Sequence, residues 1–235
     1  MAEVLLETVG LSRAFGGLHA VADLSLRVEA GRVHAVIGPN GAGKTTLVNL
    51  LSGHLAPTAG RVLLEGRDIA GLPPYRIARL GVGRIFQRTS LFAEATCLEN
   101  CCLGAGGGRD AIGRARAALD LCDLGDLAEV RADRLSHGAA RQLEIALMLS
   151  AGPRLLLLDE PLAGMGAEES VRTTALLKKL AGDRTLVLIE HDMDAVFALA
   201  DTVTVMVDGR AIATGNPAAV RNDPAVQRAY LGHPA

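Results

Sequence analysis

One stretch of the chain has the composition of a loop that binds phosphate groups. It reads Gly38-Pro39-Asn40-Gly41-Ala42-Gly43-Lys44-Thr45 and is followed by Thr46. Glycines let successive backbone N–H groups turn toward an anion, and a helix N-terminus adds a favourable dipole. We expect Lys44 to reach the β- and γ-phosphates of a nucleoside triphosphate, and the hydroxyl of Thr45 to bind Mg²⁺.

The residues on either side of this loop support the same prediction. The apolar run 33–37 is typical of a short buried strand, and residues 46–51 continue as a helix. The pattern G-x-x-x-x-G-K-[ST] therefore stands between a strand and a helix, which is the context that gives it meaning. The alternative is a glycine-rich turn that carries a lysine by chance. It would require all of these positions to coincide.

Two adjacent acids, Asp159 and Glu160, follow the apolar run 155–158. This places them at the carboxyl end of a buried strand, where open α/β sheets bind their ligands. Asp159 could hold Mg²⁺ through water, and the carboxylate of Glu160 could polarise an attacking water. A purely structural alternative is an N-cap aspartate and a first-turn glutamate before Pro161. The phosphate loop upstream favours the catalytic interpretation.

Two other polar residues stand where predicted strands end. His191 comes soon after the apolar run 185–189, and its imidazole could contact a γ-phosphate or orient the water. Gln87 ends the predicted strand 82–86 and could bind Mg²⁺ or touch the same water. A histidine at a helix start and a glutamine in a loop are common surface features, so neither residue indicates catalysis by itself.

The sequence Leu-Ser-His-Gly at 135–138 is a second potential phosphate site. Ser136 is a candidate N-cap for a helix that begins near Ala139, and the N-terminus of that helix could bind an anion. One chain seldom directs two such sites at one phosphate. A second chain facing the first could bring Ser136 and Gly138 to it.

The composition narrows the class of protein. The chain has 235 residues, 49% of them hydrophobic, which allows one large domain or a core with a subdomain. Its net charge of −2 argues against binding nucleic acid by neutralising phosphates. No apolar run approaches the roughly 20 residues that span a membrane, and residues 1–9 lack the features of a signal peptide. We expect a cytoplasmic protein that reaches a membrane only through partners.

The predicted elements change character along the chain. Strands are expected at 4–9, 21–28, 33–37, 61–64, 82–86, 154–158, 185–189, 203–207 and 210–213. Helices are expected at 46–53, 73–80, 168–180 and 192–200, with two short ones in 217–230. Residues 96–124 are helix-like, interrupted by a glycine connector at 106–108. The four cysteines, which match no zinc spacing, are expected to be buried free thiols: Cys97, Cys101, Cys102 and Cys122.

This order predicts an α/β fold with a P-loop nucleoside triphosphatase core. The core would have a mostly parallel sheet, an N-terminal antiparallel β layer and an inserted helical subdomain. We expect a single domain over 1–235. Residues 1–88 and 150–235 would form the nucleotide-binding core, and residues of about 89–149 the helical subdomain.

The chain resembles an ATP-binding cassette (ABC) ATPase over essentially its whole length. The motifs that carry the resemblance follow the family's order: 38–45, Gln87, 135–138, 155–160 and His191. The resemblance implies a head-to-tail dimer with two ATP molecules, each held between one chain's phosphate loop and the Ser136 and Gly138 of the other. It also implies that Phe15 stacks on adenine, that Glu160 is the general base and that His191 is the switch residue.

Two segments depart from the family pattern. His137 and Ala139 replace the first glycine and the glutamine of Leu-Ser-Gly-Gly-Gln, while Ser136 and Gly138 are kept. Gly166 stands where the family has the aspartate of Ser-Ala-Leu-Asp. These departures put in doubt whether this chain communicates with its partner across the dimer. They do not affect the prediction that the chain binds nucleotide.

Other stretches, at 15–21, 77–87, 98–100, 221–224 and 229–232, are similar to the ATPases of branched-chain amino-acid importers. Importers of urea and short amides share them. The similarity implies transmembrane permease subunits, a second ATPase subunit, identical or different, and indirectly a periplasmic or extracellular solute-binding protein. It places the chain at the cytoplasmic face of the membrane. The alternatives are the ATPase of a lipid or lipopolysaccharide exporter and a non-transport ABC ATPase. A signalling GTPase is disfavoured because no Asn-Lys-x-Asp motif occurs.

Overall fold

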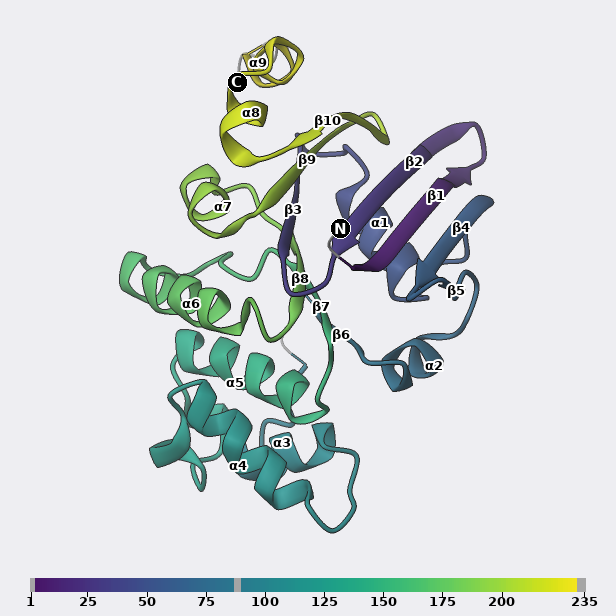
Figure 1. Cartoon of the computed structure of the whole chain (residues 1–235). Helices are drawn as coiled ribbons and strands as arrows, with labels where there is room; N and C mark the ends of the chain where they lie inside the picture. The colour runs from purple at the N-terminus through teal and green to yellow at the C-terminus, as the bar shows by residue number, and fades with distance from the viewer. Residues whose placement is uncertain (1–2, 87–89, 232–235) are drawn as a thin grey trace.

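The computed structural model describes residues 3–86 and 90–231 and contains two sheets with helices around them (Figure 1). The first sheet is antiparallel, in the order β2-β1-β4-β5, and consists of β1 (Val4–Phe15), β2 (Leu18–Glu29), β4 (Ala59–Leu64) and β5 (Arg67–Asp68). The second has the order β10-β9-β3-β8-β7-β6 and consists of β3 (Val33–Ile37), β6 (Val82–Ile85), β7 (Leu155–Asp159), β8 (Thr185–Ile189), β9 (Thr202–Val207) and β10 (Arg210–Gly215). Its strand pairs are parallel except β9 with β10. The predicted fold class is confirmed.

The helices cover both faces of the larger sheet. They are α1 (Lys44–Leu51), α2 (Pro74–Arg79), α3 (Cys97–Gly104), α4 (Ala111–Leu121), α5 (His137–Ser150), α6 (Ala167–Leu180), α7 (Met193–Leu199), α8 (Pro217–Arg221) and α9 (Pro224–Leu231). Two 3-10 turns, η1 (Gly125–Leu127) and η2 (Ala132–Arg134), precede α5. The helices α3, α4 and α5 gather at one end of the molecule, below the sheet in Figure 1. Within residues 3–86 and 90–231, no helix is long and apolar enough to cross a membrane.

The leucine run of β7 shows how this sheet is held from both sides. All of its residues are buried, and side chains of a strand alternate between the two faces. Leu155 and Leu157 join the apolar cluster that includes α1 and the antiparallel sheet. Leu156 and Leu158 join the cluster formed with α5 and α6. The strand that carries Asp159 is therefore fixed by two cores at once.

The structure differs from the sequence-based expectations in several details. The first two strands are longer than predicted and pair up to Phe15 and Leu18 at the hairpin end. Helix α5 begins at His137, earlier than expected, because the Ser136 hydroxyl caps it by accepting a hydrogen bond from the Ala139 N–H at 3.2 Å. The glycines 106–108 do connect α3 to α4.

The cysteines gather in the helical region, and all four are free thiols. Cys97, Cys101 and Cys122 are buried as expected, whereas Cys102 is only half-buried. Adjacent residues on a helix point in different directions, which explains the difference between Cys101 and Cys102. Burial raises the pKa of Cys101 and Cys122 to about 12, so both stay protonated at neutral pH.

His34 in β3 makes the stability of the fold depend on pH. Its side chain is 2% exposed, and Nε2 lies 2.9 Å from Oγ1 of Thr204. Burial lowers the pKa of His34 from 6.5 to about 4. The unfolded chain therefore binds a proton in this range before the folded chain does, and protonation favours unfolding. We expect a stability contribution that is complete above pH 6.5 and declines toward pH 4, by about 3 kcal/mol in total.

Urea unfolding of the wild type and of His34→Gln across pH 4–7 measures this contribution. Other titrating groups are common to both proteins, so the difference between the two curves isolates His34. The wild type should lose free energy of unfolding more steeply on acidification. Parallel curves would contradict the assignment.

Candidate nucleotide-binding site

The predicted phosphate loop joins the carboxyl end of β3 to α1. Gly43 precedes the helix with a φ of +96°, and a Cβ at this position would collide with the carbonyl oxygen of Ala20 on β2. Glycine is therefore required there. The loop curls around the amine of Lys44, whose Nζ donates to the carbonyl oxygens of Gly38 at 2.6 Å and Pro39 at 2.9 Å.

A cavity of about 440 Å³ opens beside this loop. It is lined by Leu18, His19, Ala20, Asn40, Gly41, Ala42, Gly43, Lys44, Thr45, Thr46, Glu160 and Asp208. The structure thus brings Glu160, from the end of β7, to the phosphate loop, as the sequence predicts. Burial lowers the pKa of Lys44, and the charges of Glu160 and Asp159 oppose that change. Asp208 was not foreseen, because a residue in an Asp-Gly turn indicates only a hairpin.

Asp159 is buried at the end of β7 and lies next to Arg84 of β6. The distance between Nη2 of Arg84 and Oδ2 of Asp159 is 3.8 Å. Burial raises the pKa of Asp159, while the Arg84 guanidinium opposes the rise. The other oxygen, Oδ1, is buried and has no hydrogen-bond partner among the described residues. An unpartnered buried carboxylate oxygen suits a cation or its bound water, so these residues fit the predicted Mg²⁺.

Arg84 is a residue whose importance the sequence-based interpretation missed. Its Nη1 donates to Oδ1 of Asn49 at 2.7 Å and to Oγ of Ser52 at 2.8 Å, so it ties the end of α1 to Asp159. A charged residue inside a short, otherwise apolar strand was the available signal, because buried arginines are almost always paired.

The predicted residues His191 and Phe15 are not among those that line this cavity. The side chain of His191 is 68% exposed at the end of β8, with Nδ1 3.8 Å from Oε2 of the buried Glu190. Phe15 lies at the hairpin end opposite the lining residue Leu18, and the guanidinium of Arg13 covers its ring at 4.6 Å. Gln87 lies outside the described residues.

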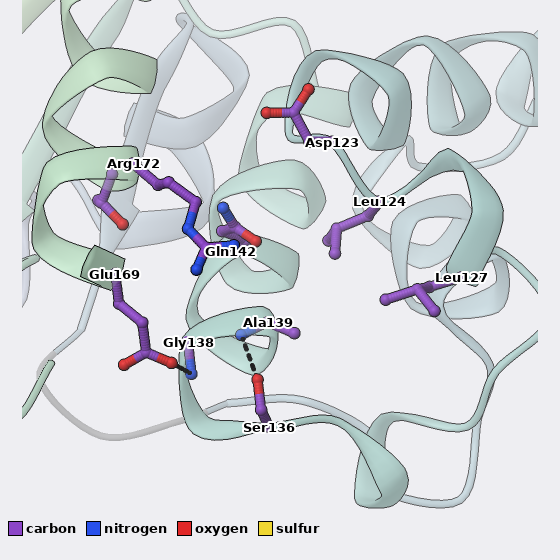
Figure 2. Close-up of a pocket in the computed structure, with 10 residues that line it drawn as sticks. Asp123, Leu124, Leu127, Ser136, Gly138, Ala139, Gln142, Glu169 and Arg172 are labelled. Atoms are coloured by element: carbon purple, nitrogen blue, oxygen red, sulfur yellow. Dashed lines mark hydrogen bonds between the residues drawn. The ribbon is translucent and has the colours of Figure 1, made fainter. Parts of the chain in front are cut away.

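Ser136 and Gly138 line a separate cavity of about 230 Å³, shown in Figure 2. No residue is common to the linings of the two cavities. The carboxylate of Glu169 reaches into this region from α6 and accepts hydrogen bonds from the N–H groups of Gly138 at 3.1 Å and Gly166 at 3.2 Å (Figure 2 shows the first). Within one chain, the two potential phosphate sites are therefore apart.

Residues 21–163 match the ABC transporter family. The chain belongs to this family. The C-terminal residues 212–235 match a second one, the branched-chain amino acid ATP-binding cassette transporter family. The ABC assignment makes the chain an ATP-binding ATPase, as the phosphate loop and the two acids predicted.

Relatives match over nearly the full length of the ABC ATPase chain. A high-affinity branched-chain amino acid transport ATP-binding protein, BraF of Pseudomonas aeruginosa, is 40% identical over 99% of both chains. LivG of Escherichia coli, with the same description, is 38% identical, also over 99% of both. A solved nucleotide-free ATP-binding cassette of an ABC transporter, 30% identical, superimposes with a TM-score of 0.89 over 98% of this chain and 100% of the other. The ADP conformation of such a cassette, also 30% identical, gives 0.90 over 98% and 99%.

Proposed function

We propose that this chain is the ATPase subunit of a membrane importer for branched-chain amino acids or related amino-acid and amide solutes. The observation that carries the proposal is the match to branched-chain amino acid transport ATP-binding proteins from end to end, including the separate C-terminal match at 212–235. The cavity in which Lys44 and Glu160 meet supports the energy-supplying reaction. The ATPase itself would never touch the transported solute.

In the proposed reaction, ATP binds with its phosphates along residues 38–45. The backbone N–H groups of the loop and the Lys44 ammonium would neutralise the β- and γ-phosphates. The carboxylate of Glu160 would take a proton from a water whose oxygen attacks the γ-phosphorus, and the bond to ADP would break. His191 would orient that water or contact the γ-phosphate, and Phe15 would stack on adenine.

The proposed cation site uses groups from three segments. Thr45, Asp159 and Gln87 would hold Mg²⁺, directly or through water. When bound, the ion supplies positive charge that stabilises the phosphate oxygens as the γ-phosphate leaves. The unpartnered Oδ1 of Asp159 supports this assignment.

The separation of the two cavities supports a two-chain site. Ser136 and Gly138 lie away from the cavity beside Lys44, so they would contact the ATP of a second ATPase subunit. Binding of two ATP molecules would close a head-to-tail dimer, and hydrolysis would reopen it. The permease subunits would hold this dimer at the cytoplasmic face of the membrane, and a solute-binding protein outside would deliver the cargo.

Deletion of this chain from its host tests the importer assignment. Uptake of radiolabelled leucine, isoleucine and valine at low concentration should be lost and restored by the wild-type chain, but not by Lys44→Ala. Lys178→Ala, on the exposed side of α6, is the matched control and should restore uptake. If uptake of these three amino acids stays normal and uptake of urea or amides is lost instead, the cargo must be reassigned to those solutes. A deletion strain that shows only a defect in lipid export would overturn the importer assignment.

A further inference from the structure

Helix α5 contains a buried ion pair that the proposed reaction does not yet use. Nη1 of Arg141 lies 2.6 Å from Oε2 of Glu144, three residues later, and both side chains are 8% exposed. Burying two charges is costly, and the attraction between them compensates only when their other hydrogen-bonding groups are also satisfied. The other hydrogen bonds of this pair therefore show which segments the two side chains position.

Those contacts end on the backbone of two other segments. Arg141 donates from Nη1 to the carbonyl oxygen of Phe86 at 2.8 Å, from Nη2 to that of Glu160 at 3.4 Å and from Nε to that of Pro161 at 3.4 Å. The Oε1 of Glu144 accepts from the N–H of Ser90 at 2.9 Å. One side chain of α5 thus contacts the residue proposed as general base.

The backbone at Glu160 needs such support. Glu160 has a φ of +50°, a left-handed conformation that is unfavourable for a residue with a side chain. Its N–H donates to the carbonyl of Ile189 at 2.9 Å, and the buried Glu190 accepts from the N–H of Leu162 at 2.9 Å. The end of β8 holds this turn on one side and Arg141 holds it on the other.

The same helix reaches the second phosphate site. Its N-terminus presents Ser136 and Gly138, and Glu169 joins Gly138 to Gly166, as Figure 2 shows in part. Segment 160–166 is therefore tied to α5 near its start by Arg141 and at its end by Glu169. Gly166 has no side chain with which to contact another chain. The contacts of Arg141 and Glu169 therefore connect segment 160–166 to the second phosphate site instead.

We propose that Arg141, held by Glu144, is a positioning residue that couples the two ATP sites of the dimer. This inference rests on the proposed function. ATP of the partner chain would contact the N-terminus of α5, and any displacement of that helix would shift Arg141 and the carbonyl of Glu160 with it. Occupancy of one site would thus set the position of the general base in the other.

Two conservative variants test this coupling in the complete transporter. Arg141→Lys keeps the charge, but a single ammonium cannot follow the three-carbonyl pattern. Glu144→Gln keeps an acceptor for the Ser90 N–H but removes the charge that orients Arg141. We expect each to lower kcat by about 10- to 100-fold, because small displacements of catalytic groups have effects of this size. ATP affinity should be unchanged, and the Hill coefficient of hydrolysis should fall toward one.

The double variant and a control separate positioning from stability. The double variant Arg141→Lys, Glu144→Gln should lower kcat by less than the product of the two single-variant effects, because both substitutions act through one contact. Arg154→Lys disturbs an ion pair with Glu65 in which the two side chains are 58% and 41% exposed, and it should change neither kcat nor the Hill coefficient. A variant could instead show a lower melting temperature, a kcat that returns to the wild-type value on cooling, and a wild-type Hill coefficient. That result would reduce Arg141 to a structural role. A wild-type Hill coefficient of one would overturn the coupling as well.

These readouts do not depend on the cargo. An incorrect substrate assignment would show in the uptake experiment and leave the kinetics of ATP hydrolysis as they are. Failure of the ATPase assignment would show as absent hydrolysis in the wild-type transporter. The coupling fails if hydrolysis proceeds and either the wild type shows no cooperativity or the variants leave its cooperativity intact.

Discussion

Glutamine in place of Glu160 is expected to lower the rate of ATP hydrolysis by about 10²–10⁴-fold, the usual loss when a general base is removed. ATP should still bind, because Lys44 and the loop N–H groups are unchanged. The side chain of Glu160 lines the same cavity as Lys44, so it can reach a water beside the γ-phosphate. Glutamine has nearly the same shape but cannot accept the proton.

Phosphate release gives the turnover, and calorimetry with ATP gives the affinity. Glu168→Gln is the matched control, because its side chain is 91% exposed on α6 and should leave both quantities unchanged. Hydrolysis at the wild-type rate in Glu160→Gln would remove Glu160 from the role of base. Loss of ATP binding together with turnover would show that the substitution disturbs the loop as well.

The parts of this site that the sequence predicted are those encoded by local patterns. The phosphate loop, its strand and its helix occupy consecutive residues, so a spacing rule is enough to find them. Asp159 and Glu160 follow a leucine run, and parallel strands bring such endings to one edge of a sheet. The cap at Ser136 is equally local, since its hydroxyl bonds to a residue three positions later.

What the sequence did not reveal depends on partners distant along the chain. Arg84 has meaning only once β6 lies beside β7 and α1, and Arg141 only once α5 crosses the turn after β7. Glu169 looks like an ordinary first-turn acid of α6 until Gly138 is placed beside it. In each case the sequence shows which residue type is present, but not which distant residue it contacts.

The first two strands were underestimated for a different reason. Their pairing contains register shifts, at Thr8 to Leu11 and again at Leu11 to Arg13. Such bulges interrupt the alternation of apolar and polar residues from which strands are read in a sequence. The prediction therefore stopped at Val9, whereas β1 continues to Phe15 and brings the hairpin end next to the nucleotide cavity.

Alanine in place of Lys44 is expected to weaken ATP binding by about 10- to 100-fold, which corresponds to the loss of one or two hydrogen bonds from a charged donor. In the structure, the ammonium already lies within the loop, bonded to the carbonyls of Gly38 and Pro39. A triphosphate would take over part of this coordination, so the positive charge is positioned before ATP arrives. Alanine removes that charge and leaves the carbonyl oxygens of Gly38 and Pro39 without this donor.

Calorimetric titration with ATP and with ADP measures this effect, with Lys178→Ala as the control for loss of a lysine charge on an exposed helix face. The loss should be larger for ATP than for ADP, because the ammonium would contact the γ-phosphate as well as the β-phosphate. Equal weakening would place Lys44 at the β-phosphate alone. Unchanged affinity for ATP would contradict the phosphate-loop assignment, since the cavity beside residues 38–45 would then bind its ligand without the one cation that the loop supplies.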